Sequence, residues 1–237
     1  MIVIVGAAGE IGIYLTRRFA EENYKVIALD KRSSTELSNM EIRSFEIDFT
    51  DEAAIDAVWQ NLSLPKEVTL LNLIGCISTN SLFEVFSNWE SRRFTSILRE
   101  SFEENVFSVV SATMSFARFA FSTGLTPQII NFGSVSSEGV SGQLAYGSAK
   151  GAIQSFSRVA SVELGVFGIR VNCLVPGYVD SPKLIERISP ERLSEVIGNS
   201  TIRKLVSLED VFLATKYLHD SKTINGAQLE VHSFYGR

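Results

Sequence analysis

A tyrosine and a lysine stand four residues apart in the stretch AYGSAKGA, which runs from Ala145 to Ala152. Positions i and i+4 lie on one face of a helix, so Lys150 can stand beside Tyr146. A phenol with the ordinary pKa of about 10 is a poor base at neutral pH, but a nearby ammonium favours the phenolate and lowers that pKa. The pair therefore predicts a general acid/base tuned by a lysine. The alternative is a helix that carries one aromatic residue and one solvated lysine.

The elements that must position this pair alternate along the chain. The expected strands are short, β-branched and in several cases apolar throughout, as strands covered on both faces are: Ile2–Val5, Val26–Leu29, Ile42–Ile47, Thr69–Ile74, Gln128–Phe132, Ile169–Val175 and Ala227–Val231. The expected helices are Ile11–Glu22, Glu52–Asn61, a long one ending near Thr123, Tyr146–Gly165 and Leu208–Asp220. This β-α-β order implies right-handed crossovers. We expect an α/β fold, a doubly wound parallel sheet of about seven strands with helices on both faces.

A glycine-rich loop joins the first expected strand to the first helix. The stretch GAAGEIG places glycines at Gly6, Gly9 and Gly12. Glycines let the backbone turn tightly and approach a pyrophosphate, and the N-terminus of the following helix offers free N–H groups. The alternative is a plain strand–helix turn. Asp30 ends the second strand, where a carboxylate can bond both ribose hydroxyls of an adenosine, so we expect a nucleotide here.

The charges around this loop bear on the cofactor. The carboxylate of Asp30 repels a 2′-phosphate, and the loop itself carries Glu10 and no basic residue. Lys31 and Arg32 follow Asp30 and could instead pair with such a phosphate. We expect NAD, with NADP the less favoured alternative.

Four motifs in one order make the chain resemble a known family. GAAGEIG, NLIG, a serine followed by YGSAK, and PGYVDS resemble the short-chain dehydrogenase/reductase family, in its shorter, single-domain branch. The resemblance covers essentially the whole chain. It implies one Rossmann-fold domain over residues 1–237, with a substrate flap near residues 178–203. It also implies an NAD(P)-dependent oxidoreductase that moves a hydride between nicotinamide and a secondary alcohol or ketone.

The resemblance assigns roles residue by residue. Tyr146 is the acid/base, Lys150 tunes it and holds the nicotinamide ribose, Ser134 bonds the substrate oxygen, and Asn105 completes a proton relay. Ser136 and Ser137 are close enough to Ser134 in the sequence to be confused with it. Tyr146 and Lys150 belong to both the catalytic and the cofactor-binding sets, and no metal is expected. The other expected cofactor-binding residues are Gly6, Gly9, Glu10, Ile11, Gly12, Asp30, Asp48, Phe49, Asn72, Gly75, Pro176, Gly177, Val179 and Ser181.

The chain also departs from the family pattern. Glu10 stands where the shorter branch has a glycine, and NLIG replaces the usual NNAG, so one amide that braces the central strands is absent. The segment between Gly75 and Asn105 is longer than usual, and EVHSFYG stands where V-D-G-G is common. These differences bear on the subfamily and the assembly, because none of them deletes a reacting group.

Composition bounds the partners. A net charge of −5 and a pI near 5.2 argue against nucleic acid, and the apolar runs are shorter than the ~20 residues that span a bilayer. Cys76 and Cys173 lie in apolar runs and are expected to be buried free thiols, which suits a reducing compartment and a cytoplasmic protein. The helix over Phe102–Phe121 is apolar on more than one face, and by resemblance it packs in a homodimer or homotetramer.

Two other functions stay open at this stage. The spacing of the glycines and Asp30 also suit a sugar-nucleotide epimerase or dehydratase, although such enzymes usually need a longer C-terminal substrate domain. A non-catalytic nucleotide sensor is the third reading, although such proteins commonly lose the tyrosine or the lysine that this chain keeps. The substrate is a small molecule whose identity the residues do not indicate.

Overall fold

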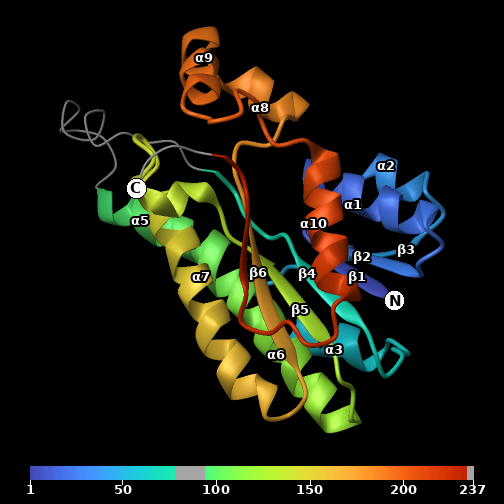
Figure 1. Cartoon of the computed structure of the whole chain (residues 1–237). Helices are drawn as coiled ribbons and strands as arrows, with labels where there is room; N and C mark the ends of the chain where they lie inside the picture. Colours follow the sequence, from blue (N-terminus) through green and yellow to red (C-terminus); the bar gives the residue numbers. More distant parts are fainter. Residues whose placement is uncertain (78–93, 234–237) are drawn as a thin grey trace.

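The computed structural model describes residues 1–77 and 94–233 of the chain, which build one parallel sheet between layers of helices (Figure 1). Its strand order is β3-β2-β1-β4-β5-β6-β7, and every neighbouring pair is parallel. The order runs outward in both directions from β1 and β4, so the doubly wound sheet expected from the sequence is confirmed. The strands are β1 (Ile2–Val5), β2 (Val26–Asp30), β3 (Arg43–Glu46), β4 (Thr69–Asn72), β5 (Gln128–Phe132), β6 (Arg170–Pro176) and β7 (Gln228–Val231).

Helices cover both faces of the sheet because the central strands are apolar on both faces. Along β1, Ile2 and Ile4 face α1 and α10, whereas Val3 and Val5 face α3 and α6. Figure 1 shows α1 and α10 on one side of the sheet and α3, α6 and α7 on the other. The helices are α1 (Glu10–Glu21), α2 (Thr35–Ser38), α3 (Glu52–Gln60), α5 (Phe94–Phe102), α6 (Ser108–Thr123), α7 (Leu144–Gly165), α8 (Pro182–Arg187), α9 (Pro190–Gly198) and α10 (Leu208–Asp220).

Two short irregular helices lie at the end of the sheet that carries the predicted site. A π-helical turn, η1 (Glu103–Phe107), interrupts the long helix between α5 and α6, and a 3₁₀ turn, η2 (Val135–Glu138), follows β5. The sequence predicted the long helix but not its π turn, which contains Asn105. Part of the long 76–104 segment, residues 78–93, lies outside the described residues.

Among the described residues, one helical stretch, Thr95–Thr123, is long and apolar enough to cross a membrane by length and composition. The short apolar runs had led us to expect no such segment. On the inner face of this helix, Ala112, Phe116 and Ala120 are fully buried against the sheet and α3. A single helix of this kind is weak evidence for a membrane span, because core helices pass the same test.

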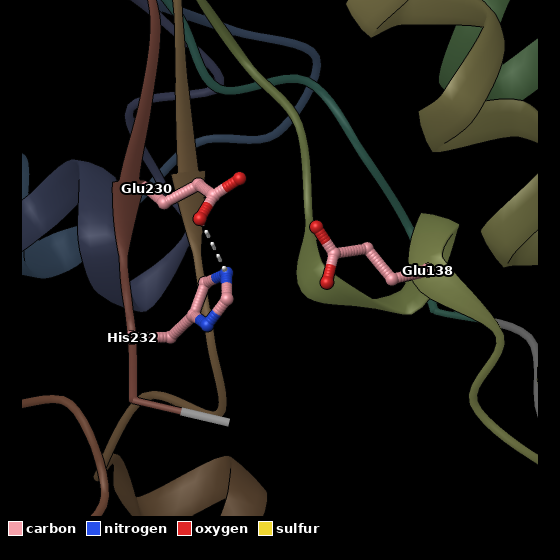
Figure 2. Close-up of side chains that lie close together, drawn as sticks. All are labelled: Glu138, Glu230 and His232. Carbon is pink, nitrogen blue, oxygen red and sulfur yellow. Dashed lines mark ion pairs between the residues drawn. The ribbon is translucent and has the colours of Figure 1, made fainter. Parts of the chain in front are cut away.

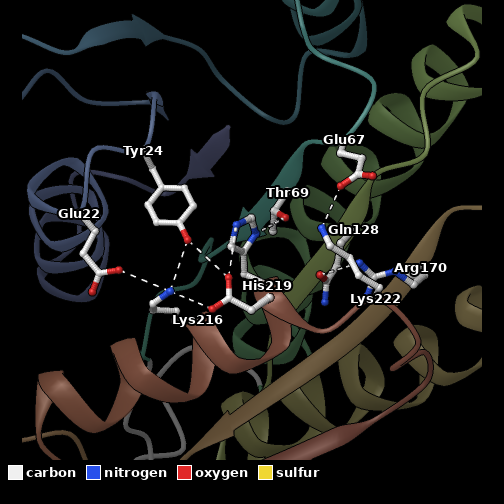
Figure 3. A network of polar contacts seen from close by, with 10 residues as sticks. Glu22, Tyr24, Glu67, Thr69, Gln128, Arg170, Lys216, His219 and Lys222 are labelled. Carbon is white, nitrogen blue, oxygen red and sulfur yellow. Dashed lines mark hydrogen bonds and ion pairs between the residues drawn. The ribbon is translucent and has the colours of Figure 1, made fainter.

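A polar network joins α10 to the opposite end of the sheet (Figure 3). Nδ1 of His219 lies 2.7 Å from Oγ1 of Thr69 on β4, and the rings of Phe19 and Tyr24 pack edge-on against the imidazole. Nζ of Lys216 lies 2.8 Å from Asp220 in the same network. Burial is the main cause that lowers the pKa of His219 to about 4. The imidazole is therefore held neutral.

His219 is expected to make stability depend on pH. Its pKa of about 4 in the folded protein lies below the ordinary value of 6.5, so the unfolded chain binds this proton first. The contribution of the neutral imidazole to the free energy of unfolding is complete above pH 6.5. As the pH falls to 4, the free energy of unfolding decreases by an amount on the order of 2–3 kcal/mol. Urea unfolding of the wild type and His219→Gln, from pH 8 to 4, measures it. The glutamine cannot titrate, so parallel curves for the two proteins would contradict this account.

Candidate active site

The glycine loop packs too closely for side chains at two of its three glycines. Gly6 has a φ of 79°, and a Cβ on it would lie 2.8 Å from the backbone of Leu73. A Cβ on Gly12 would lie 2.5 Å from the carbonyl oxygen of Gly6. Among the described residues no side chain caps α1 at Gly9, whereas Asp51 caps α3 in the usual way. The first N–H groups of α1, including that of Ile11, therefore suit an anionic ligand such as a pyrophosphate.

Asp30 ties this loop to the end of β2. Its carboxylate is 7% exposed, and it accepts hydrogen bonds from the N–H groups of Ala8 at 2.9 Å and Arg32 at 3.0 Å. Each carboxylate oxygen can accept a further bond, so capacity for ribose hydroxyls remains. The next two residues that we expect to bind the cofactor, Asp48 and Phe49, follow β3. Asp48 is exposed and Phe49 is buried.

Tyr146 and Lys150 lie in the first turns of α7, and both are buried. Their exposed fractions are 9% and 4%, and Nζ of Lys150 lies 5.8 Å from the centre of the Tyr146 ring. The ammonium donates to the carbonyl oxygens of Phe132 at 3.0 Å and Ile74 at 3.4 Å, just at the ends of β5 and β4. The structure thus brings the predicted pair together at the carboxyl end of the sheet. This end is where parallel α/β sheets bind ligands.

The two groups are shifted in opposite directions by the same cause. Burial raises the pKa of Tyr146 to about 12, against a smaller lowering by the hydroxyl of Ser134. Burial also lowers the pKa of Lys150 to about 8. The sequence led us to expect an ammonium that lowers the pKa of the phenol. In the protein by itself burial is the main cause of the raised pKa of Tyr146, and Lys150 is not among the groups that shift it.

Three neighbouring serines follow β5, and their contacts distinguish them. Ser134 is 8% exposed, and its Oγ donates to Oγ of Ser136 at 3.0 Å. Oγ of Ser137 lies 2.7 Å from the carbonyl oxygen of Ser134 and 3.0 Å from Oε1 of Gln154, and its one proton can be donated to either, while Ser136 donates to Gln143. Of these three hydroxyls, that of Ser134 affects the pKa of Tyr146. The geometry therefore favours Ser134 as the serine of the site.

Asn105 is fully buried in η1 and holds the chain just beyond β4. Its Oδ1 accepts from the N–H of Cys76 at 2.9 Å, and its Nδ2 donates to the carbonyl oxygens of Cys76 and Ser101, each at 3.0 Å. Gly75 fits between this amide and the lysine, since a Cβ there would lie 2.9 Å from Nζ of Lys150 and 3.0 Å from Oδ1 of Asn105. Four predicted residues, Gly75, Asn105, Tyr146 and Lys150, thus form one packed cluster.

Gly75→Ala is expected to lower kcat by about 10- to 100-fold, because the added methyl group displaces the ammonium of Lys150 from its place beside Tyr146. The measurement is steady-state kinetics together with thermal unfolding. Gly151→Ala is the matched control, since its Cβ would meet the nearest atom at an ordinary 3.7 Å. Equal kcat values for the two variants would show that Gly75 does not shape the site.

The side chain of Asn72 bonds to α6. It is fully buried on β4, and its Nδ2 donates to the carbonyl oxygen of Val109 at 3.0 Å and to Oγ1 of Thr113 at 3.3 Å, both on α6. Thr113 in turn donates to Asn131 of β5, whose amide reaches Ser157 of α7. This chain of contacts braces the central strands, and the sequence reading missed it because its members are far apart in the chain.

The predicted residues after β6 meet the glycine loop and β7. Pro176 ends β6, and the N–H of Gly177 donates to the carbonyl oxygen of Val231 at 3.1 Å. Val179 forms a parallel bridge with Val206, so the expected flap, which contains α8 and α9, is joined to the chain before α10. Ser181 caps α8, and its Oγ donates to the carboxylate of Glu10 at 2.7 Å.

The family model described as short chain dehydrogenase matches residues 1–192. The chain belongs to the short-chain dehydrogenase family. Its members are oxidoreductases that use NAD(P) on CH–OH or keto groups, as the sequence predicted.

Individual relatives of this short-chain dehydrogenase agree with that assignment. An uncharacterised oxidoreductase of Schizosaccharomyces pombe, C922.06, is 29% identical over 98% of the chain and 88% of its own length. The solved structure of 4-hydroxyisoleucine dehydrogenase complexed with NADH has a TM-score of 0.84 at 20% identity, with 100% and 99% of the two chains covered. ElxO with NADP bound has a TM-score of 0.83 at 19% identity, with 97% and 96% covered. These two structures share the fold.

One cluster at the rim of this short-chain dehydrogenase site includes a histidine (Figure 2). His232, just after β7, lies 3.9 Å from the carboxylate of Glu230 and faces Glu138 of η2. A Cβ on Gly177 would lie 2.7 Å from Cβ of His232, so the histidine backs onto a predicted cofactor residue. Within the described ranges this is the one group of three possible metal ligands whose donor atoms lie within 4.8 Å of one another. Both carboxylates are exposed, and such groups are common without a metal.

The two cysteines of this short-chain dehydrogenase are free, but they differ in burial. Cys173 lies inside β6, and burial raises the pKa of its thiol to about 11. Cys76 is exposed, so the expectation that both thiols are buried is wrong for this residue. The apolar run NLIGCI misled the reading, because β4 ends at Asn72 and the chain has left the sheet when it reaches Cys76.

Proposed function

We propose that this protein is an NAD-dependent oxidoreductase, folded as a single Rossmann-like domain, in which Tyr146 is the acid/base for a secondary alcohol or ketone. The observation that carries the proposal is the buried pair of Tyr146 and Lys150 at the carboxyl ends of β4 and β5. The glycine loop fits the cofactor, because the N-terminus of α1 carries no side-chain cap among the described residues. When bound, nicotinamide supplies or accepts the hydride.

The chain's own residues handle the proton. Tyr146 takes the proton of a substrate hydroxyl during oxidation and returns it to the oxygen during reduction. Ser134 hydrogen-bonds the same oxygen and holds it near the phenol. An ammonium has three donors, and Lys150 uses two of them on backbone carbonyls, so the third is available for the phenol or for a ribose hydroxyl. Asn105 and Gly75 keep the lysine in that position.

The preference for NAD rests on the carboxylate of Asp30 at the end of β2. Titration of protein fluorescence with NADH and NADPH tests it on the wild type and Asp30→Asn. The asparagine keeps an oxygen that can accept from the N–H of Ala8, and it removes the charge. We expect NADH to bind at least tenfold tighter, which is about 1.4 kcal/mol, and the variant to lose that preference. Equal or tighter binding of NADPH to the wild type would reverse the choice of cofactor, and failure of both to bind would remove the cofactor site.

The exposed apolar side chains of η1, α6 and α7 support a homo-oligomer. Large apolar side chains on η1, α6, α7 and the turn that follows are at least 44% exposed, and the rings of Phe121 and Phe167 pack against each other. They suit a dimer or tetramer formed through these helices, and light scattering on the purified chain measures its mass. The exposed residues include Phe107, Met114, Phe121, Val159, Val162, Val166 and Phe167.

Two free thiols and an acidic charge fit a cytoplasmic enzyme that binds no nucleic acid.

A further inference from the structure

A carboxylate from the glycine loop reaches across to the flap. Glu10 is the first residue of α1 and stands in the place of a family glycine. Its two oxygens each accept one hydrogen bond from the start of α8: Oε2 from Oγ of Ser181 at 2.7 Å and Oε1 from the N–H of Lys183 at 2.9 Å. The partners are 171 and 173 residues away in the chain. Both sides of the expected cofactor cleft are therefore joined by one side chain.

The bond to Glu10 determines what the hydroxyl of Ser181 can do. A serine hydroxyl has one proton to donate and two lone pairs that can accept. Ser181 donates its proton to the carboxylate, in a short, charge-assisted bond, and accepts from the N–H of Leu184 at 3.4 Å. One lone pair remains, on a side chain that is 8% exposed. Toward a ligand, Ser181 is consequently an acceptor and not a donor.

We propose that Glu10 is a positioning residue that orients the nicotinamide carboxamide through Ser181. The carboxamide has an NH₂ group that donates and a carbonyl oxygen that accepts, so a fixed acceptor selects which of the two faces α8. The inference rests on the proposed function, since it needs a nicotinamide beside Ser181. It also gives Glu10 a role in the cofactor-free protein, because the carboxylate holds the first turn of α8 against the glycine loop.

The cofactor-free role has its own measurement. In Glu10→Ala the N–H of Lys183 loses its acceptor, so hydrogen exchange of this amide, followed by NMR, should accelerate at least tenfold. Glu21→Gln, at the far end of the same helix α1, is the matched control and should leave exchange at Lys183 unchanged. Unchanged exchange in Glu10→Ala would overturn the contact on which the inference stands.

The orienting role is tested by a cofactor that lacks the NH₂ group. In the 3-acetylpyridine analogue of NADH a methyl group replaces that NH₂ and the carbonyl remains. We expect the wild type to bind NADH at least tenfold tighter than the reduced analogue in fluorescence titration. Glu10→Ala and Ser181→Ala should each bring this ratio below about threefold, and the double variant should change it no further. A merely structural role would weaken both ligands equally.

The outcomes separate the inference from the proposed function. If NADH binds the wild type and the ratio survives in Glu10→Ala, Glu10 does not orient the carboxamide and the oxidoreductase proposal stands. A ratio near one in the wild type overturns the inference in the same way. If neither NADH nor the analogue binds the wild type, the proposed function itself fails.

Discussion

Tyr146→Phe is expected to lower kcat about a thousandfold, while the Kd for NADH changes less than threefold. The phenol hydroxyl is the proton donor and acceptor of the proposed reaction, and positioned acid/base groups of this kind contribute about 10²–10⁴ in rate. Phenylalanine keeps the ring that packs beside Lys150, so the site should stay folded. The measurement is steady-state kinetics on an alcohol found by screening with NAD, with NADH binding measured in parallel.

Ser134→Ala gives the comparison for this experiment. It removes a hydrogen bond to the substrate oxygen but leaves the acid/base in place, so its loss of kcat should be smaller than that of Tyr146→Phe. If Tyr146→Phe retained a tenth or more of the wild-type kcat, another group would have to carry the proton.

Lys150→Met is expected to abolish turnover and, at the same time, to stabilise the fold. Burial lowers the pKa of Lys150 from 10.5 to about 8, so the folded protein pays to keep the ammonium charged at neutral pH. Methionine has a similar length and no charge. The variant should therefore gain on the order of 2–3 kcal/mol in the free energy of unfolding at pH 7, although the two lost hydrogen bonds offset part of that gain.

The pH dependence of this effect has a definite sign. The unfolded chain keeps the lysine proton up to about pH 10.5 and the folded chain releases it near pH 8, so wild-type stability should rise between these values. The advantage of Lys150→Met should shrink over the same range. Urea unfolding at pH 7 and pH 9.5 measures both proteins. A variant that is less stable than the wild type at pH 7, or that keeps its turnover, would contradict the account.

Local patterns in the sequence were enough to predict the strands and the pairing of Tyr146 with Lys150. β1 and β5 begin and end at the expected residues, and β1 is apolar throughout because it is covered on both faces. The four-residue spacing of Tyr146 and Lys150 determined their common helical face without any tertiary information. The loop with Gly6 and Gly12 was predictable for the same reason, since its turn is a property of the backbone.

Other features depend on contacts between distant residues, and the sequence did not predict them. The π turn around Asn105 lies inside a continuous helix, and no residue in it marks the change of helix type. The raised pKa of Tyr146 comes from burial, which arises only when α7 packs on the sheet. The bond between Glu10 and Ser181 joins residues 171 positions apart, so no local pattern indicates it.

The central claim is that Tyr146 becomes an effective acid/base when cofactor is present. The direct measurement is the absorbance of tyrosinate near 295 nm during pH titration, taken as the difference between the wild type and Tyr146→Phe, with and without saturating NAD⁺. In the protein alone the pKa of Tyr146 is about 12. The account predicts that bound NAD⁺ lowers it by about two units or more, because a positive nicotinamide favours the phenolate. A pKa that does not move while NAD⁺ is shown to bind would contradict the claim.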